Sequence, residues 1–222
     1  EEGGGGISIR DSLKIDISDG VFESNKAGSH GGAICAETTE VNITGGRFIM
    51  NSSGENGGAV NLTNCKAVMS KGTASSKGAT FTLNTAGARG GAVCVGNNEL
   101  EIAEGTFSSN TAGTNGGAIY ANVATVEITG GTFTSNNSSG AKGGGAMCLN
   151  DCVTTISSGI FNTNSSIENG GGLYVEKGMM TMNGGTISGN TAGGNGGGVY
   201  NAGTFQMHDG KNTGNTARTT SY

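Results

Sequence analysis

The sequence predicts an all-β fold: a single-stranded parallel β-helix, or solenoid, of about eight coils with about 26 residues in each. Three observations predict it: a motif that recurs along the chain, apolar residues that alternate within short segments, and glycine pairs at a fixed place between them. The clearest copy of the motif is residues 106–120, TFSSNTAGTNGGAIY. Its Asn recurs at steps of 26, 33, 26, 26, 28, 26 and 25 residues, so the whole chain, 1–222, is expected to form one solenoid.

Each coil is predicted to contain three short strands. In residues 116–141 these are 118–121, 125–129 and 132–135, and the residues between them favour turns. Alternation directs Ile119, Ile128 and Phe133 to one face, the interior. The equivalent positions elsewhere are apolar: Ile34, Val60, Val93, Met147, Leu173 and Val199 in the first strand, and Ile17, Ile43, Met69, Ile102, Ile156, Met182 and Met207 in the second. These columns are expected to stack about 4.8 Å apart.

The coils are less regular at the ends and at one place inside the chain. Residues 1–30 are a partial first coil, and 201–222 are a degenerate last coil with Asn212 in the Phe position. The step of 33 residues contains an insertion, 73–79, expected at the corner between the second and third strands. Neither end has an obvious cap, which terminal repeats of solenoids usually need. We therefore expect either a segment of a longer solenoid or head-to-tail self-association.

A column of asparagines is expected to form a structural ladder. An Asn side chain can bond the coils above and below it, and Asn tolerates the left-handed conformation of tight turns. This role is favoured over ligand binding for Asn25, Asn51, Asn84, Asn110, Asn136, Asn164, Asn190 and Asn215. The glycine pairs mark bends, because no helical pattern with Lys-Ser/Thr follows them as it does in a phosphate-binding loop.

Composition and spacing argue against several functions. A net charge of −5 argues against nucleic acid, and no apolar run approaches the ~20 residues that membrane insertion by this segment would need. Glu101 and Glu127 are neighbouring outward acids, but an exposed, solvated pair is the favoured interpretation. His30 and His208 lie near opposite ends of the repeat array, so no enzyme is expected. No metal or cofactor is expected either, since the turns almost lack acid and the cysteine spacing does not fit zinc.

The five cysteines leave two alternatives open. Cys35, Cys94 and Cys148 share an outward column but are two coils apart, about 9.6 Å by rung spacing, too far for a bridge. Cys148 and Cys152 are the pair for a local disulfide, and Cys65 could meet Cys35 or Cys94 across coils. The alternative is that the cysteines are reduced.

Gly-Gly-Ala-Ile/Val paired with Phe-x-x-Asn resembles the repeats of the chlamydial polymorphic membrane proteins. Residues 184–205, GGTISGNTAGGNGGGVYNAGTF, are also similar to adhesin-like β-helix repeat proteins on the surface of gut bacteria and archaea. The resemblance covers nearly the whole chain. It implies a right-handed parallel β-helix on a cell surface, often adhesive or structural, and it supplies no catalytic residues.

Two outward surfaces are candidates for ligand binding. Stacked Thr and Ser residues beside the Phe column, in an arrangement that some ice-binding solenoids use, are Thr80, Thr82, Thr106, Ser108, Thr132, Thr134, Thr186 and Ser188. Strand propensity is the favoured explanation, and the rows are broken at Arg47/Ile49 and Ile160/Asn162. Tyr120, Tyr174 and Tyr200 offer stacking surfaces for sugars or a partner protein, although cross-strand packing is the favoured interpretation.

The sequence therefore predicts an extracellular, cell-surface β-helix segment with a structural or adhesive role, which stacks end to end in one interpretation. Ligands on a host surface are its expected partners. The alternative function is ice or glycan binding on the Thr/Ser or Tyr columns.

Overall fold

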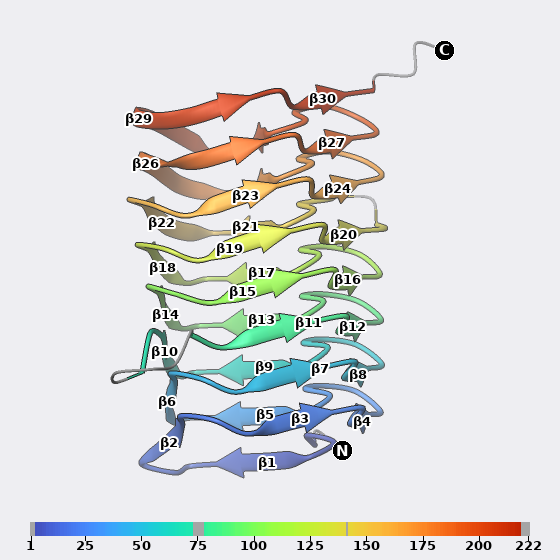
Figure 1. Ribbon diagram of the computed structural model, residues 1–222, viewed down its shortest axis with the longest axis vertical. Coiled ribbons are helices and arrows are strands. Elements are labelled where there is room, and N and C mark those ends of the chain that lie inside the picture. Colours follow the sequence, from blue (N-terminus) through green and yellow to red (C-terminus); the bar gives the residue numbers. More distant parts are fainter. Residues whose placement is uncertain (1–2, 73–77, 141, 219–222) are drawn as a thin grey trace.

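A computed structural model describes residues 3–72, 78–140 and 142–218. This part of the chain contains 30 strands and no helix, and all strand pairs are parallel between successive coils. In Figure 1 the first coil lies at the bottom, with β1 (Ile7–Arg10) at the back, β2 (Lys14–Ile17) on the left and β3 (Val21–Glu23) in front. The chain therefore rises as a right-handed coil (Figure 1). The predicted parallel β-solenoid of about eight coils is confirmed.

The first strand of each coil belongs to an eight-stranded sheet, which we call sheet A. Its strands are β1, β5 (Ile34–Glu37), β9 (Val60–Thr63), β13 (Val93–Gly96), β17 (Ile119–Asn122), β21 (Met147–Asn150), β25 (Leu173–Val175) and β28 (Val199–Asn201). The strands lie in register, so that Cys94 pairs with Asn61 on one side and Tyr120 on the other.

The second and third strands of each coil belong to sheet B, which has 14 strands. The second strands are β2, β6 (Glu40–Ile43), β10 (Lys66–Met69), β14 (Glu99–Ile102), β18 (Thr125–Ile128) and β22 (Cys152–Ile156). The third strands are β3, β7 (Arg47–Ile49), β11 (Thr80–Thr82), β15 (Thr106–Ser108), β19 (Thr132–Thr134) and β23 (Ile160–Asn162). In the last two coils the second and third strands are continuous, as β26 (Gly178–Ser188) and β29 (Thr204–Thr213). Because β26 pairs with both β22 and β23, the second and third strands of all coils belong to one sheet.

A fourth strand in each coil was not expected from the sequence. It is two residues long and directly follows the Asn of the repeat, within what the sequence presents as a polar loop. These strands form sheet C: β4 (Lys26–Ala27), β8 (Ser52–Ser53), β12 (Thr85–Ala86), β16 (Thr111–Ala112), β20 (Asn137–Ser138), β24 (Ser165–Ser166), β27 (Thr191–Ala192) and β30 (Thr216–Ala217). Each coil with separate second and third strands therefore contains four strands, one more than the three that were predicted.

The 33-residue repeat does not disturb the register. Thr80, the first residue of β11, pairs with Arg47 before it and with Thr106 after it. The additional residues therefore lie between β10 and β11, at the corner between the second and third strands. Of the predicted insertion 73–79, residues 73–77 lie outside the described residues.

Apolar columns fill the interior as the alternation predicts. Six phenylalanines stack along the rod, with ring centroids 4.6 to 4.8 Å apart and planes within 9° of parallel. They are Phe22, Phe48, Phe81, Phe107, Phe133 and Phe161, and Ile187 continues the column. Burial of such side chains is the main favourable term, about 1.5–3 kcal/mol for each aliphatic or Phe side chain. In the last coil Asn212 is exposed, so the Phe column ends at Ile187. Met207 is also exposed, so its predicted interior position in the second-strand column is wrong.

Glycine pairs turn the chain into sheet A. Gly116 has φ of +68°, a conformation that residues with a Cβ rarely adopt. At Gly117 a Cβ would collide with the carbonyl oxygen of Gly145 in the following coil. The first glycine therefore provides the turn, and the second permits the coils to approach.

Candidate functional site

The Asn column forms a continuous hydrogen-bonded ladder. The amide nitrogen of Asn110 donates to Asn136 Oδ1 at 2.9 Å and to the carbonyl oxygen of Phe81 at 2.9 Å. Its Oδ1 accepts from the backbone N–H and the side-chain Nδ2 of Asn84, both at 3.0 Å. The side-chain link runs from Asn25 through Asn51, Asn84, Asn110, Asn136, Asn164 and Asn190 to Asn215. Because these groups are fully used within the ladder, they hold coils together and offer nothing to a ligand.

The Thr and Ser columns line the outer face of the third strands. Thr80, Thr106, Thr132 and Thr186 form one column, which Arg47 and Ile160 interrupt. Thr82, Ser108, Thr134 and Ser188 form the second, which Ile49 and Asn162 interrupt. Thr82 and Ser108 share a hydrogen bond of 3.0 Å between their hydroxyl oxygens, and Thr134 bonds Thr163 at 3.1 Å. One pair within the columns therefore bonds across coils, and Thr134 bonds a Thr outside them, so these three hydroxyls have protein partners rather than water alone.

Much of the outward column of sheet A is buried, which agrees with cross-strand packing and leaves little Tyr surface for a ligand. Cys94, Tyr120, Cys148 and Tyr174 form a second apolar cluster on the outer side of the sheet, separate from the main core, and Tyr200 packs against it. Tyr120 is only 4% exposed and Tyr174 8%. Burial raises the pKa of Tyr120 to about 12, although Arg89 opposes this. These two rings therefore act in packing, and Tyr174 stacks on Tyr200 with centroids 5.2 Å apart.

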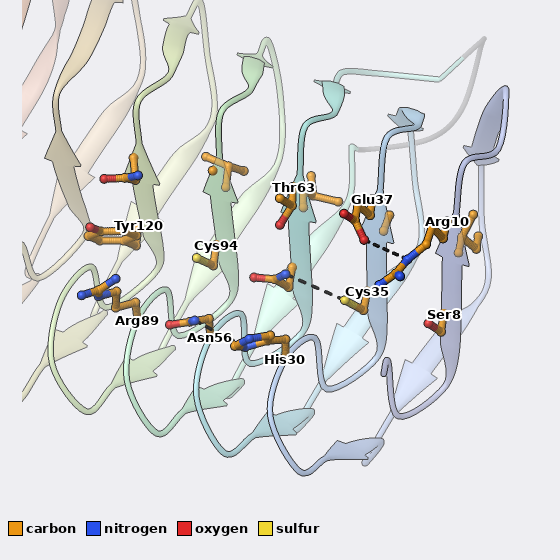
Figure 2. Close-up of a pocket in the computed structure, with 17 residues that line it drawn as sticks. Ser8, Arg10, His30, Cys35, Glu37, Asn56, Thr63, Arg89, Cys94 and Tyr120 are labelled. Carbon is orange, nitrogen blue, oxygen red and sulfur yellow. Dashed lines mark hydrogen bonds and ion pairs between the residues drawn. The ribbon is translucent and has the colours of Figure 1, made fainter. Parts of the chain in front are cut away.

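A groove runs over this face of sheet A in the first coils (Figure 2). It has a volume of about 250 Å³, just below the range of about 300–1,000 Å³ that is typical of small-molecule sites. Cys35, Asn61 and Cys94 form its floor. Figure 2 shows His30, Asn56 and Arg89 in a row along one side, with Arg10, Glu37 and Thr63 along the other.

Charged groups close the sides of the groove. Arg10 Nε lies 2.9 Å from a carboxylate oxygen of Glu37. The Arg89 guanidinium lies over the Tyr120 ring, 5.0 Å from its centroid, which is within range for a cation–π contact. Nδ1 of His30 accepts from the Asn56 amide at 3.3 Å, so the ring proton is assigned to Nε2, 3.6 Å from Glu55 Oε2. Among the described residues, no carboxylate pairs with Arg89 and no group accepts a hydrogen bond from its guanidinium.

The residues on the His30 side were not identified from the sequence. They occupy the position directly before each glycine pair, and successive coils are joined there by single β-bridges between His30, Asn56, Arg89 and Asn115. In most repeats this position is Asn. His30 and Arg89 differ from it, and an alignment of the repeats shows this difference. The alignment alone does not show that these side chains lie over the outer face of sheet A.

Of the two alternatives left open for the cysteines, the structure has the reduced one, with no disulfide between Cys148 and Cys152. Cys148 belongs to the cluster on the outer side of sheet A, whereas Cys152 belongs to the main core inside the solenoid. One side chain therefore points out of the solenoid and the other into it. The suggested bridges of Cys65 are absent too, and its thiol donates to backbone oxygens of Ala36 and Thr63. Burial raises the pKa of Cys94 to about 12 and that of Cys152 to about 11, which keeps these thiols protonated and unreactive at neutral pH.

The ionisable groups weighed for catalysis lie apart or in solvent. Glu101 and Glu127 are paired neighbours in β14 and β18, and both are exposed. His30 lies at the end of the first coil, between β4 and β5, and His208 is exposed in β29, in the last coil. Within the described ranges, no group of three or more His, Cys, Asp or Glu residues is arranged to hold a metal ion.

The stacked coils define the class: a β-helix repeat protein. A family model of the Chlamydia polymorphic membrane protein repeat matches residues 19–37 and 104–122. Each matched segment contains a Phe-x-x-Asn, the following glycine pair and the next strand of sheet A. The chain is thus a β-helix repeat protein, and two of its repeats are similar to the repeat of the chlamydial polymorphic membrane proteins. Comparisons with curated proteins and with solved structures find no significant match.

No helix in the described residues is long and apolar enough to span a membrane.

Proposed function

We propose that the chain is an extracellular β-helix segment of a cell-surface protein, with a structural and adhesive role. The observation that carries the proposal is the repeat match at two places in a continuous parallel solenoid. The repeat is described from membrane proteins, and the segment itself forms a rod with polar residues over much of its outer surface.

The ladder suits a structural role. Each coil is bonded to the next by strand pairing in three sheets and by an Asn side chain with no exposed surface in most coils. Such a rod resists local opening because each backbone edge inside it is covered by a neighbouring coil. A stiff rod can hold a binding surface away from the membrane to which it is attached.

Two measurements test the proposal. Antibodies to the chain should label intact source cells, and latex beads coated with the folded chain should attach to cultured epithelial cells more than beads coated with the heat-denatured chain. Labelling only after permeabilisation would reject the surface location. Equal attachment of folded and denatured coatings would reject adhesion by the rod.

A further inference from the structure

We propose that the groove on sheet A binds an acidic oligosaccharide, and that Arg89 receives its carboxylate or sulfate group. This inference rests on the adhesive role and names the class of ligand. The groove, the unpaired guanidinium and the lining of amides and hydroxyls carry the argument.

The charge of the groove is opposite to that of the chain. Its lining contains Arg10, Arg89 and Glu37, which sum to +1 with His30 neutral, whereas the whole chain carries −5. Glu37 is neutralised by Arg10 at 2.9 Å, so the remaining charge is that of Arg89. An anionic ligand is therefore attracted to this face more than to the rest of the rod.

Arg89 is held in place but its donors are unused. Its contact with Tyr120, 5.0 Å from guanidinium carbon to ring centroid, favours a position at the edge of the groove, and Tyr120 is itself buried between Cys94 and Cys148. No described residue accepts a hydrogen bond from this guanidinium or pairs with its charge. A planar guanidinium binds a carboxylate or a sulfate with two parallel hydrogen bonds, and a guanidinium that is already oriented loses less entropy when it does so.

The rest of the lining suits sugar hydroxyls. Asn56, Asn61 and Asn122 contribute amides, and Ser8 and Thr63 contribute hydroxyls. On sheet A these groups come from alternate coils, those of β1, β9 and β17. Amides and hydroxyls both donate and accept, as the hydroxyls of a sugar require. Ser8 and Asn61 lie two coils apart in one outward column, and Thr63 and Asn122 lie two coils apart in the next, a spacing of about 9.6 Å. They therefore face an extended ligand that lies along the rod.

Calorimetric titration of the whole chain at low salt tests the proposal. The two acidic sugars are a hyaluronan hexasaccharide, which carries carboxylates, and a heparin hexasaccharide, which also carries sulfates. Cellohexaose is the neutral-sugar control, and a hexaglutamate peptide is the acidic control that is not a sugar. Binding of either acidic sugar, weakened by added salt, is expected and identifies the anionic group. Arg89→Gln should weaken it about tenfold or more, as loss of charged hydrogen bonds predicts. Arg47→Gln, an equally exposed change on β7 of sheet B, should leave it unaltered.

The Cys35 thiol on the groove floor supplies a second readout. It is only partly buried, whereas the other four cysteines are buried, so the bound sugar should slow its reaction with a maleimide. The proposal is overturned if neither acidic sugar binds, if cellohexaose binds equally well, if only the peptide binds, or if Arg89→Gln and Arg47→Gln have the same effect. Beads that still attach to cells when the acidic sugars fail to bind would retain the adhesive role and reject only this ligand.

Discussion

Replacing one Asn of the ladder tests how much the ladder stabilises the rod. The Asn110 side chain makes four hydrogen bonds in a fully buried place: it accepts two from Asn84 and donates one each to Asn136 and the Phe81 carbonyl. Each such bond contributes about 0.5–1.5 kcal/mol. Asn110→Ala should therefore lower the free energy of unfolding by about 4 kcal/mol, a large part of the ~5–15 kcal/mol typical of a domain.

Asn110→Asp separates the donating half of the amide from the accepting half. The new carboxylate keeps the two bonds from Asn84 but faces two oxygen acceptors, those of Phe81 and Asn136. Burial and these oxygens favour the protonated acid, so its folded pKa rises above the ~3.9 of an unfolded Asp. The neutral acid can donate one bond again. The loss of stability relative to the native sequence should thus be smallest below pH 4 and should grow as the pH rises through the folded pKa.

Urea unfolding followed by far-UV circular dichroism at pH 7 and pH 4 measures both effects. Asn137→Asp is the matched control, because this neighbouring side chain bonds Ser139 and Ser165 near the surface. It should cost less than about 1 kcal/mol and depend little on pH. Equal losses for Asn110→Asp and Asn137→Asp, or a loss from Asn110→Asp that does not change with pH, would refute the reasoning. A two-step unfolding curve would show that the rod opens at the altered coil, as expected for a solenoid with nearest-neighbour coupling.

Three further predictions concern stability and thiol chemistry. Val123 has φ of +51° and is 49% exposed, a strained state for a β-branched residue, so Val123→Asn should raise the free energy of unfolding by about 1 kcal/mol in the same urea assay; a decrease would mean that the strain is absent. Thr154 is buried in the core with an unpartnered hydroxyl, so Thr154→Val should stabilise by about 1 kcal/mol or more, and Thr154→Ser, which keeps the hydroxyl and removes a methyl, should destabilise. Ellman's reagent at pH 7 should react quickly with one thiol per native chain, Cys35, and with all five after denaturation; rapid reaction of two or more native thiols would contradict the burial described above.

Much of the fold follows from the sequence, because stacking repeats one environment many times. Phe107, Ile119 and Ile128 recur in the same phase in coil after coil, and a position that is apolar in nearly every coil must face the interior. The short strand Thr111–Ala112 was missed for a related reason. Two residues are too few to show alternation, so it cannot be distinguished from a turn until its neighbours in sheet C are seen.

The groove itself was not predicted from the sequence; only the outer position of the residues on its floor was. Alternation assigns Tyr120 and Cys94 to the outer side of the wall, which is correct, but it cannot show that a further layer covers them there. Arg89 lies five residues before Cys94 in the chain and contacts Tyr120 of the following coil. Such contacts depend on how the corner folds back over the sheet, and the repeat period carries no information about that. The repeat period likewise did not show that Cys152 lies in the main core while Cys148 lies on the outer side of sheet A, so it did not exclude a bridge between them.

The Asn ladder also gives the rod an electrical direction. Backbone hydrogen bonds between coils run both ways: Ala118 donates to Ala146 in the next coil, whereas Thr111 donates to Asn84 in the previous one. Every side-chain amide link in the ladder instead donates toward the C-terminal coils. Their dipoles add, as peptide dipoles do in an α-helix, and aligned amides polarise one another.

The partial positive end of this array faces the C-terminal coils. Two solenoids of this kind could continue each other's ladder only if they point the same way, since opposed arrays would set donor against donor or acceptor against acceptor. A single column of uncharged side chains is thereby enough to distinguish one direction along the rod from the other.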